Sequence, residues 1–280
     1  MITNPNVKIN LGLNVLRKRE DGFHDLETLF VPYYGISDTL EIIVGDDYSR
    51  TSAAIFGKYA PEMIAQGISE DGKLMITIAR KEGVDWDPLK DLTAKAYYLL
   101  SEDHQLPPVK IFLEKTSPVG AGLGGGSADA AFALKMLNEI CSLGLSDDLL
   151  AGYAARLGSD CAFFIYNRPM IGEGRGEILS DYQFEGLNDY DLQVLTPEGV
   201  SVSTAQAYGG IVPKMPETSL RDALKLPVEQ WDGVLVNDFE TTVFDKHPAL
   251  AAIKRSLYDS GAVYASMSGS GSALFALYKK

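Results

Sequence analysis

The deciding stretch of this sequence is Thr116-Ser117-Pro118-Val119-Gly120-Ala121-Gly122-Leu123-Gly124-Gly125-Gly126-Ser127-Ala128-Asp129. Five glycines fall between Gly120 and Gly126. Glycine permits backbone conformations closed to other residues, and without a Cβ it lets N–H groups come close to a ligand. This composition predicts a loop whose backbone holds a ligand.

The neighbouring segments predict a strand before this loop and a helix after it. Residues 109–115 alternate and include β-branched residues, which is typical of a strand. From Ser127 onward, apolar residues recur at helical spacing, and Gly144 is expected to end the helix. The expected buried face consists of Ala130, Leu134, Leu137 and Cys141. A loop that ends at a helix start offers unpaired N–H donors and the positive end of the helix dipole, so the order predicts an anion site.

Two common nucleotide motifs fit this loop poorly. The spacing Gly120-x-Gly122-x-x-Gly125 matches a Rossmann fingerprint, but that motif belongs to the first turn of a βαβ unit with an acidic residue about twenty positions on. The Gly-Lys-Ser/Thr ending of a P-loop is missing, which excludes a Walker-type site. A flexible loop without a ligand is the remaining alternative, and the abrupt start of an amphipathic helix disfavours it.

The composition describes an acidic protein with enough apolar residues for one large or two medium domains. The chain has 280 residues, of which 46% are hydrophobic and 22% are charged. Lysine and arginine number 25 against 38 acidic residues, which gives a formal net charge of −13. A protein of this charge is not expected to bind nucleic acid through its overall field, so a phosphate must be held by local cations and backbone N–H groups.

The cysteines and the N-terminus add no sign of secretion or of membrane insertion. Cys141 and Cys161 lie in apolar stretches without zinc spacing, which predicts buried thiols rather than a disulfide or a metal site. Residues 1–16 lack a basic segment followed by an apolar core, and no window reaches the roughly 18 apolar residues of a membrane span. We expect a cytoplasmic protein without a membrane partner.

The first 45 residues are expected to be mostly sheet. Residues 7–15 alternate with period two and predict a half-buried strand on which Lys8 and Asn10 face the same way. Residues 26–34 and 38–44 predict two further strands. The polar residues 46–71 show no clear period.

Helices are expected later in the first half of the chain, at residues 92–100 and 147–157. The apolar residues 161–166 are interpreted as a strand, so that Gly158-Ser159-Asp160 would form a helix-to-strand junction. From about residue 170 the character changes: strands at 191–196 and a helix at 247–260 indicate a second unit that closes on residues 263–278. The fold class expected is α+β, with a domain boundary near residue 165.

Residues 118–128 closely resemble the phosphate-binding motif of the GHMP kinases, named for galacto-, homoserine, mevalonate and phosphomevalonate kinases. The early segment Lys8-Ile9-Asn10-Leu11 and the late segment Met267-Ser268-Gly269-Ser270-Gly271-Ser272 match the other features of this family in order. The resemblance implies a two-domain GHMP kinase fold. Residues 1–165 would form an ATP-binding domain like ribosomal protein S5 domain 2, and residues 166–280 a ferredoxin-like domain on the substrate side.

The resemblance also implies the cofactors ATP and Mg²⁺, the latter to neutralise charge between the β- and γ-phosphates. The implied ATP-binding residues are Pro118, Val119, Gly120, Ala121, Gly122, Leu123, Gly124, Gly125, Gly126, Ser127 and Ala128. Ser127 is expected to contact the phosphates or the metal, and a helix cap is the alternative for this residue.

Three further segments resemble the members of this family that act on a cytidine diphosphate derivative of methylerythritol, in the non-mevalonate isoprenoid pathway. The segments are residues 8–13, 21–26 and 157–160. The resemblance implies transfer of the ATP γ-phosphoryl group to the 2-hydroxyl of this small molecule. Asp160 would be the base, and Lys8 would hold its carboxylate ionised and orient the hydroxyl. The structural alternatives are a solvated strand lysine for Lys8 and a helix cap for Asp160.

Substrate recognition is expected from an aromatic residue and a histidine, Phe23 and His24, with one ring stacking on the cytosine and the other hydrogen-bonding its edge. Tyr208 would cover the second face of the base. Asn10 is expected to hydrogen-bond the substrate, and Thr204 to contact its phosphates. The alternatives are core edges for Phe23 and Tyr208 and a loop position for His24.

Three departures from the usual family pattern leave parts of this interpretation open. Cys161-Ala162 stands where a valine-proline pair is common, Phe23 stands where tyrosine is common, and residues 4–7 are larger than usual. The run of residues 172–177 is interpreted as a structural turn. The alternatives for the function are another kinase of this family, of the homoserine or mevalonate type, and a non-catalytic nucleotide-binding protein on the same fold.

Overall fold

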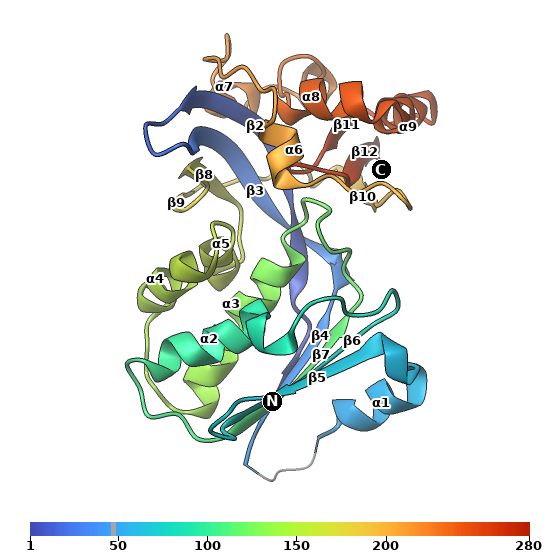
Figure 1. The fold of residues 1–280 in the computed structure, drawn as a ribbon. Coiled ribbons are helices and arrows are strands. Elements are labelled where there is room, and N and C mark those ends of the chain that lie inside the picture. Colours follow the sequence, from blue (N-terminus) through green and yellow to red (C-terminus); the bar gives the residue numbers. More distant parts are fainter. Residues whose placement is uncertain (46–48) are drawn as a thin grey trace. The chain divides into compact units, whose positions relative to one another are not determined.

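The computed structural model describes residues 1–45 and 49–280, and these form two compact units (Figure 1). The first unit comprises Met1–Val7, Tyr34–Val119 and Gly124–Asn167, and the second comprises Lys8–Tyr33, Gly120–Leu123 and Arg168–Lys280. The predicted domain limits, 1–165 and 166–280, are limits along the sequence and stay a prediction. The units follow spatial contacts instead, and two pieces of the first 165 residues belong to the second unit.

The first unit contains a five-stranded sheet in the order β1-β4-β7-β6-β5. Its strands are β1 (Ile2–Thr3), β4 (Thr39–Val44), β5 (Ile64–Ile68), β6 (Leu74–Arg80) and β7 (Val109–Lys115). β6 and β7 pair in parallel, and the other neighbours pair antiparallel. β7 is the strand predicted before the glycine loop, and its bounds are confirmed.

Helices cover both faces of this sheet (Figure 1). They are α1 (Thr51–Lys58), α2 (Leu92–Ser101), α3 (Gly125–Ile140), α4 (Asp147–Leu157) and α5 (Cys161–Tyr166), with short 3₁₀ helices at Pro61–Met63 and Pro88–Lys90. Ile43, Ala79 and Phe112 pack with Ile55 of α1 on one face. Side chains alternate between the faces of a strand, so chain neighbours such as Ile42 and Ile111 point to the opposite face. These residues are also fully buried. Both faces of the sheet therefore belong to the core.

Local sequence explains where the helices begin. The Ser146 side chain accepts a hydrogen bond from the Leu149 N–H, and two aspartates occupy the first turn of α4. Asp91 caps α2 in the same way, by accepting from the Thr93 N–H. The predictions of helices at residues 92–100 and 147–157 are confirmed.

Three sequence-based expectations for the first half of the chain are wrong. Residues 161–166 form helix α5 rather than a strand, because a six-residue apolar run is buried whichever structure it adopts. The strand at residues 7–15 is buried on both sides, with Lys8 at 2% and Asn10 at 3% exposure, rather than half-buried. The stretch without a clear period contains α1 and β5, and its first residues, 46–48, lie outside the described residues.

The second unit contains two sheets. One has the order β2-β3-β8-β9 and the other the order β10-β12-β11. The strands are β2 (Asn6–Lys18), β3 (His24–Ser37), β8 (Met170–Gly174), β9 (Ile178–Asp181), β10 (Tyr190–Leu195), β11 (Tyr264–Met267) and β12 (Leu274–Lys279). The first two residues of β2 and the end of β3, from Tyr34 on, belong to the first unit. The helices are α6 (Thr204–Tyr208), α7 (Leu220–Ala223), α8 (Phe239–Lys246) and α9 (Pro248–Asp259), with a 3₁₀ turn at Val228–Gln230.

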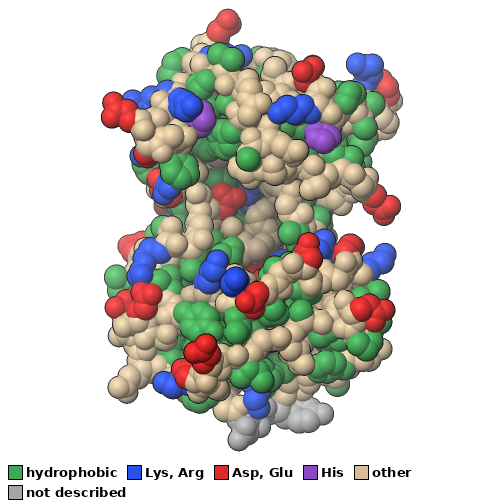
Figure 2. Space-filling model, viewed as in Figure 1, with side chains coloured by type: hydrophobic (Ala, Val, Ile, Leu, Met, Phe, Trp, Pro, Cys, Tyr) green, Lys and Arg blue, Asp and Glu red, His purple; other side chains and the backbone are tan. Residues whose placement is uncertain are grey.

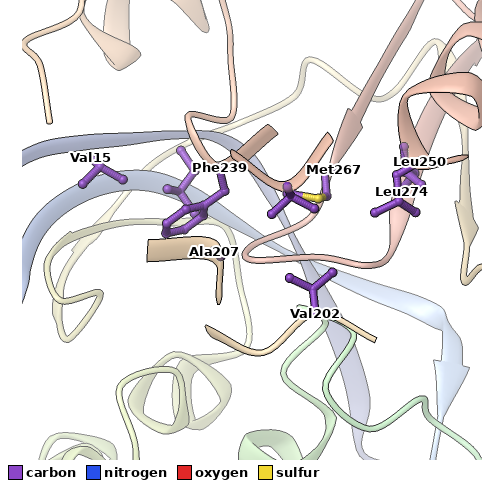
Figure 3. Close-up of a cluster of buried hydrophobic side chains, with 9 residues drawn as sticks. Val15, Val202, Ala207, Phe239, Leu250, Met267 and Leu274 are labelled. Atoms are coloured by element: carbon purple, nitrogen blue, oxygen red, sulfur yellow. The ribbon is translucent and has the colours of Figure 1, made fainter. Parts of the chain in front are cut away.

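A cluster of buried apolar side chains joins the elements of the second unit (Figure 3). Val15 of β2 packs here with Phe239 of α8, Leu250 of α9 and Met267 of β11. Tyr208 of α6 packs against this cluster from its edge. The cluster fixes α6, which carries Thr204 and Tyr208, to β2, which carries Asn10.

Candidate active site

The glycine loop connects β7 directly to α3, in the order that the sequence predicts. Gly120, Gly122 and Gly124 have φ of 72°, 77° and 73°, a region that favours glycine. Val119, at the start of the loop, is 51% exposed. The N-cap of α3 is Gly124, which has no side chain to cap the first turn. The first-turn N–H groups are therefore available to an anion.

Lys8 of β2 is buried against the middle of this loop. Its Nζ donates to the Gly122 carbonyl oxygen at 2.7 Å and to Asn10 Oδ1, and its backbone N–H donates to the Leu123 carbonyl oxygen at 3.0 Å. Asn10 Nδ2 in turn donates to Thr28 Oγ1 of β3 at 3.1 Å. Because Lys8 is 2% exposed, the alternative of a solvated strand lysine is wrong.

The late glycine-rich segment holds the same part of the loop. Ser268 Oγ donates to the Gly122 carbonyl oxygen at 3.0 Å, and the Ala273 N–H donates to the Ala121 carbonyl oxygen at 3.0 Å. A Cβ on Gly122 would lie 2.2 Å from the Ser268 carbonyl oxygen, so only glycine fits. The early, middle and late motifs of the sequence, far apart along the chain, thus meet at Gly122.

Asp160 lies at the N-terminal end of α5, in the first unit. It occupies the N-cap position without a side-chain capping bond to the described part of α5. A Cβ on Gly158 would lie 3.9 Å from Ser127 Oγ, which places this turn beside the first turn of α3. Lys8 belongs to the second unit, so its predicted contact with Asp160 stays a prediction, as does the role of Asp160 as base.

Ser127 is the third residue of α3 and is half-buried. Because Gly124 is the N-cap, the alternative that Ser127 caps the helix is wrong. The Ser127 hydroxyl interacts with Cys161, whose thiol pKa is raised by burial to about 12 despite this hydrogen bond. Both cysteines are free thiols, as predicted, although Cys141 is only half-buried.

The predicted substrate residues Phe23, His24 and Tyr208 all lie in the second unit. The His24 and Tyr208 rings stack on each other with centroids 4.8 Å apart, and Tyr208 makes an edge contact with Phe239 at 4.7 Å. Burial, followed by the charge of Lys18, lowers the pKa of His24. The structure brings His24 and Tyr208 together, and no open slot for a base separates these two rings. Tyr208 also packs at the edge of the core, as its structural alternative predicts.

Phe23 is 52% exposed, so it is not an edge of the core. The Arg175 guanidinium lies over its ring, with Cζ 4.9 Å from the centroid. Arg175 stands in the turn between β8 and β9, so the segment interpreted as a structural turn also contacts a predicted substrate residue. Thr204 is exposed at the first position of α6, behind the N-cap Ser203.

The sequence analysis missed three buried charged residues beside the glycine loop. Lys115 Nζ donates to Asp38 Oδ2 at 2.7 Å and to Asp129 Oδ2 at 2.6 Å, and all three side chains are at most 3% exposed. The available signal was the position of Asp129, a charged residue within the buried face of the helix predicted after the loop.

Charge of either sign is spread over the visible surface rather than gathered in one field (Figure 2). The described residues bring together no group of three or more histidine, cysteine, aspartate and glutamate side chains that could hold a metal ion. Every helix within residues 1–45 and 49–280 is too short or too polar to cross a bilayer.

Family models match both halves of the chain. The model for the GHMP kinases N terminal domain matches residues 91–168, and the model for the GHMP kinases C terminal region matches residues 219–280. A 4-diphosphocytidyl-2-C-methyl-D-erythritol kinase of Bacteroides thetaiotaomicron is 46% identical over 279 residues, which cover 100% of this chain and 92% of the relative. The kinase of the same name from Cytophaga hutchinsonii is 40% identical over 278 residues, 99% of this chain and 92% of the relative.

Solved structures agree with the sequence relatives. A crystal structure of 4-(cytidine 5'-diphospho)-2C-methyl-D-erythritol kinase matches with a TM-score of 0.75 and 28% identity, covering 99% of this chain and 90% of the other. A mevalonate kinase matches with a TM-score of 0.65 at 12% identity, covering 100% and 91%, and so shares the fold. The expected two-domain fold of the α+β class is confirmed. The chain belongs to the GHMP kinases and, within them, to the family of the 4-diphosphocytidyl-2-C-methyl-D-erythritol kinases.

Proposed function

We propose that this chain transfers the γ-phosphoryl group of ATP to the 2-hydroxyl of 4-diphosphocytidyl-2-C-methyl-D-erythritol, a step of non-mevalonate isoprenoid synthesis. Similarity to kinases of that name over the whole chain supports the substrate. One structural observation carries the phosphoryl-transfer site: the buried ammonium of Lys8 is fixed on the carbonyl oxygen of Gly122, within the glycine loop.

The loop and the start of α3 would bind the ATP phosphates. Three glycines with positive φ turn the backbone, and the first-turn N–H groups add the positive end of the helix dipole. This binding uses backbone groups and therefore suits an acidic protein, whose overall field repels a nucleotide. The exposure of Val119 and Gly120 leaves the loop open to a ligand.

In the reaction, the oxygen of the 2-hydroxyl forms a bond to the γ-phosphorus while the bond to the β–γ bridging oxygen breaks and ADP leaves. The hydroxyl proton passes to the carboxylate of Asp160, which acts as the general base. The loop N–H groups and Lys8 offset charge on the transferring group. The Gly122 carbonyl oxygen and the Asn10 amide oxygen accept hydrogen bonds from the Lys8 ammonium and so position it beside the loop.

Mg²⁺ would neutralise charge between the β- and γ-phosphates when bound with ATP. The half-buried hydroxyl of Ser127, in the first turn of α3, fits this ion as an oxygen ligand. Mg²⁺ in phosphoryl-transfer sites usually takes one or two protein oxygens and completes its shell with phosphates and water. A site of this kind needs no cluster of acidic side chains.

The acceptor would be recognised through its cytosine by Phe23 and His24, with Tyr208 covering the second face. Exposed Phe23 offers a ring for stacking, and the His24 imidazole offers both a donor and an acceptor. Asn10 would hydrogen-bond the methylerythritol part, and Thr204 the diphosphate. Stacking in this mode requires His24 and Tyr208 to separate on binding, because their rings are in contact.

The experiment that tests this function measures ADP release by purified protein with ATP and Mg²⁺. Four acceptors are offered in parallel: 4-diphosphocytidyl-2-C-methyl-D-erythritol, mevalonate, homoserine and galactose. Turnover with the cytidine compound alone is expected, and Asp160→Asn should reduce it by about 10² to 10⁴ while ATP binding stays near that of the wild type.

Three outcomes would each contradict a part of the proposal. Turnover with another acceptor would keep the kinase and discard the cytidine substrate. No ADP release with any of the four acceptors, while ATP still binds, would favour a non-catalytic nucleotide-binding protein. Near-normal turnover by Asp160→Asn would remove this residue from the role of base.

A further inference from the structure

Three buried charged side chains, Asp38, Lys115 and Asp129, link the two ends of the glycine loop, and we call them the clasp. Lys115 is the last residue of β7, directly before the loop, and Asp129 lies in the second turn of α3, directly after it. Asp38 follows β3 and precedes β4. All three belong to the first unit. The proposed reaction uses none of them.

Asp38 holds the segment in which the loop begins. Its carboxylate accepts four hydrogen bonds: from Lys115 Nζ, from Ser117 Oγ, and from the N–H groups of Thr116 and Ser117, at 2.6 to 2.7 Å. Burial opposes the ionisation of Asp38, but Lys115 and these donors outweigh it and lower the pKa of the carboxyl. The start of the loop is therefore tied to a buried anion.

Lys115 carries this attachment across to the end of the loop. Its Nζ bonds Asp38 Oδ2 and Asp129 Oδ2 at the same time, so one ammonium joins the residues before the loop to α3. The packing here is tight: a Cβ on Gly125 would lie 2.3 Å from Ser117 Oγ and 3.6 Å from Lys115 Nζ. Gly125, the first residue of α3, and Ser117, the second residue beyond β7, are thus packed against each other.

From this geometry we infer that the clasp is a positioning device for the nucleotide, with Lys115 holding the glycine loop in the shape that presents its N–H groups to the phosphates. The inference rests on the proposed role of the loop as the ATP site. A chain segment whose ends are fixed has fewer conformations, so it loses less entropy when a ligand orders it.

Stability alone is a poor reason for such a group in a core. A buried ion pair is commonly matched or exceeded in stability by apolar residues of similar volume, because desolvation of the charges is costly. Asp129 Oδ1 illustrates the cost, because it is buried without a hydrogen-bond partner among the described residues. Beyond packing, the clasp supplies directional hydrogen bonds, which fix particular atoms at the two ends of the loop relative to each other.

The test compares ADP binding with acceptor use in two clasp variants and one control. Lys115→Met removes the central ammonium, and Asp129→Asn keeps the shape of the side chain while it weakens the bond to Lys115. Lys58→Met is the matched control, since Lys58 pairs with Glu114 of the same strand at the surface, where its side chain is 61% exposed. The dissociation constant for ADP is measured by calorimetry, with KM for ATP and for the cytidine acceptor, at least 15 °C below each melting temperature.

We expect the ADP dissociation constant and KM for ATP to rise about tenfold in the clasp variants, as for a loop that adopts its binding shape about a tenth of the time. KM for the acceptor should stay within about twofold of the wild type, and Lys58→Met should leave all three constants unchanged. Should Lys115→Met fail to fold, Asp129→Asn carries the test. If the clasp had a purely structural role, the variants would have a lower melting temperature, but the constants for ADP and ATP would not rise more than KM for the acceptor.

Unchanged ADP binding in a folded clasp variant would overturn the inference, as would equal losses for ATP and acceptor. These results are separable from a failure of the proposed function. A wild-type protein that binds ADP but phosphorylates no acceptor would contradict the function, whereas the comparison of ADP affinities would still decide the role of the clasp.

Discussion

Two regions of the second unit, the loop segment Gly120–Leu123 and the aromatic residues Phe23, His24 and Tyr208, are held in different ways. The loop segment is fixed through backbone atoms by side chains with almost no exposure, Lys8 at 2% and Ser268 at 0%. The His24 and Tyr208 rings stack on each other, whereas Phe23 is half exposed and lies under the Arg175 guanidinium. Under the proposed assignment of these residues, the phosphate side is preformed, whereas the base side has to rearrange.

The rearrangement follows from the ring separation. A base inserted between two parallel rings needs them about 7 Å apart, twice the ordinary contact distance of about 3.5 Å. The His24 and Tyr208 centroids are 4.8 Å apart. Substitutions at the loop should therefore change turnover and folding, and substitutions at the rings should change acceptor binding alone.

The largest effect is expected from Lys8→Met. Loss of the buried ammonium beside Gly122 should lower kcat by about 10³ or more, because it removes charge stabilisation in a water-poor site. ATP affinity should change by less than about fivefold, since the loop N–H groups remain. Steady-state kinetics and nucleotide titration measure the two quantities.

Lys58→Met is the control for this change, because the Lys58 side chain is 61% exposed. An equal decrease of kcat in both variants would show that the buried position of Lys8 has no special role. This result would contradict the proposal that the phosphate side is preformed.

A large loss of folding stability is expected from Gly122→Ala. The Cβ of an alanine at this position would lie 2.2 Å from the Ser268 carbonyl oxygen. This oxygen belongs to the backbone, so it cannot move away as easily as the end of a flexible side chain. With the cost of a positive φ added, the free energy of unfolding should fall by about 3 kcal/mol or more in denaturant titrations.

Gly120→Ala separates these two contributions. Gly120 has a similar φ of 72°, but a Cβ there meets nothing within 4 Å among the described residues. Gly120→Ala should lower the free energy of unfolding by only about 1 to 2 kcal/mol. Similar losses for the two substitutions would mean that the contact of the late segment with Gly122 contributes nothing.

A moderate effect confined to the acceptor is expected from His24→Ala. Loss of a stacking ring and one hydrogen bond should raise KM for the cytidine acceptor by about 10- to 30-fold and leave KM for ATP unchanged. His104→Ala is the control, since His104 is also half-buried beside a tyrosine ring, at 6.3 Å from Tyr153. An equal rise in KM for ATP would contradict the assignment of His24 to recognition of the cytosine.

The smallest effect expected is a pH dependence of folding due to Asp38. Its pKa is lowered in the folded state, so its stabilisation is present above the unfolded-state pKa, about 3.9, and is lost as pH falls through the folded value. The gap in unfolding free energy between wild type and Asp38→Asn should therefore narrow below about pH 4, by up to about 1.4 kcal/mol per pH unit.

Lys115 and Asp129 face Asp38, and burial, reinforced by the charge of Asp38 and opposed by that of Lys115, raises the pKa of Asp129, so the gap reports this coupled group rather than Asp38 alone. Exposed Asp191→Asn serves as the control. A gap that stays constant from pH 6 to pH 3 would contradict the assignment of a lowered pKa to Asp38.

Much of the fold could be predicted where local signals are strong. The order of β7, glycine loop and α3 followed from alternation, glycine content and helical spacing, and the helix predicted at residues 147–157 is α4. Helix α5 was mistaken for a strand because a short apolar run that is buried on all sides has no visible period. The hairpin of β5 and β6 lacked any such signal and was missed.

The candidate site could be predicted only in part. Motif resemblance identified Lys8, the glycine loop and the late segment, but it did not predict that the three meet at one carbonyl oxygen, because such contacts depend on distant parts of the chain. The clasp was missed for the same reason, since Asp38 and Lys115 are far apart in sequence. The stacking of His24 on Tyr208 is likewise a tertiary contact.

The most direct test of the account is the identity of the phosphorylated product. Purified protein is incubated with Mg²⁺, ATP and 4-diphosphocytidyl-2-C-methyl-D-erythritol, and the product is examined by phosphorus NMR. The account predicts one new phosphomonoester on the 2-hydroxyl for each ADP released, with the diphosphate of the acceptor intact. ADP release without that signal, or a phosphate on another hydroxyl, would contradict it.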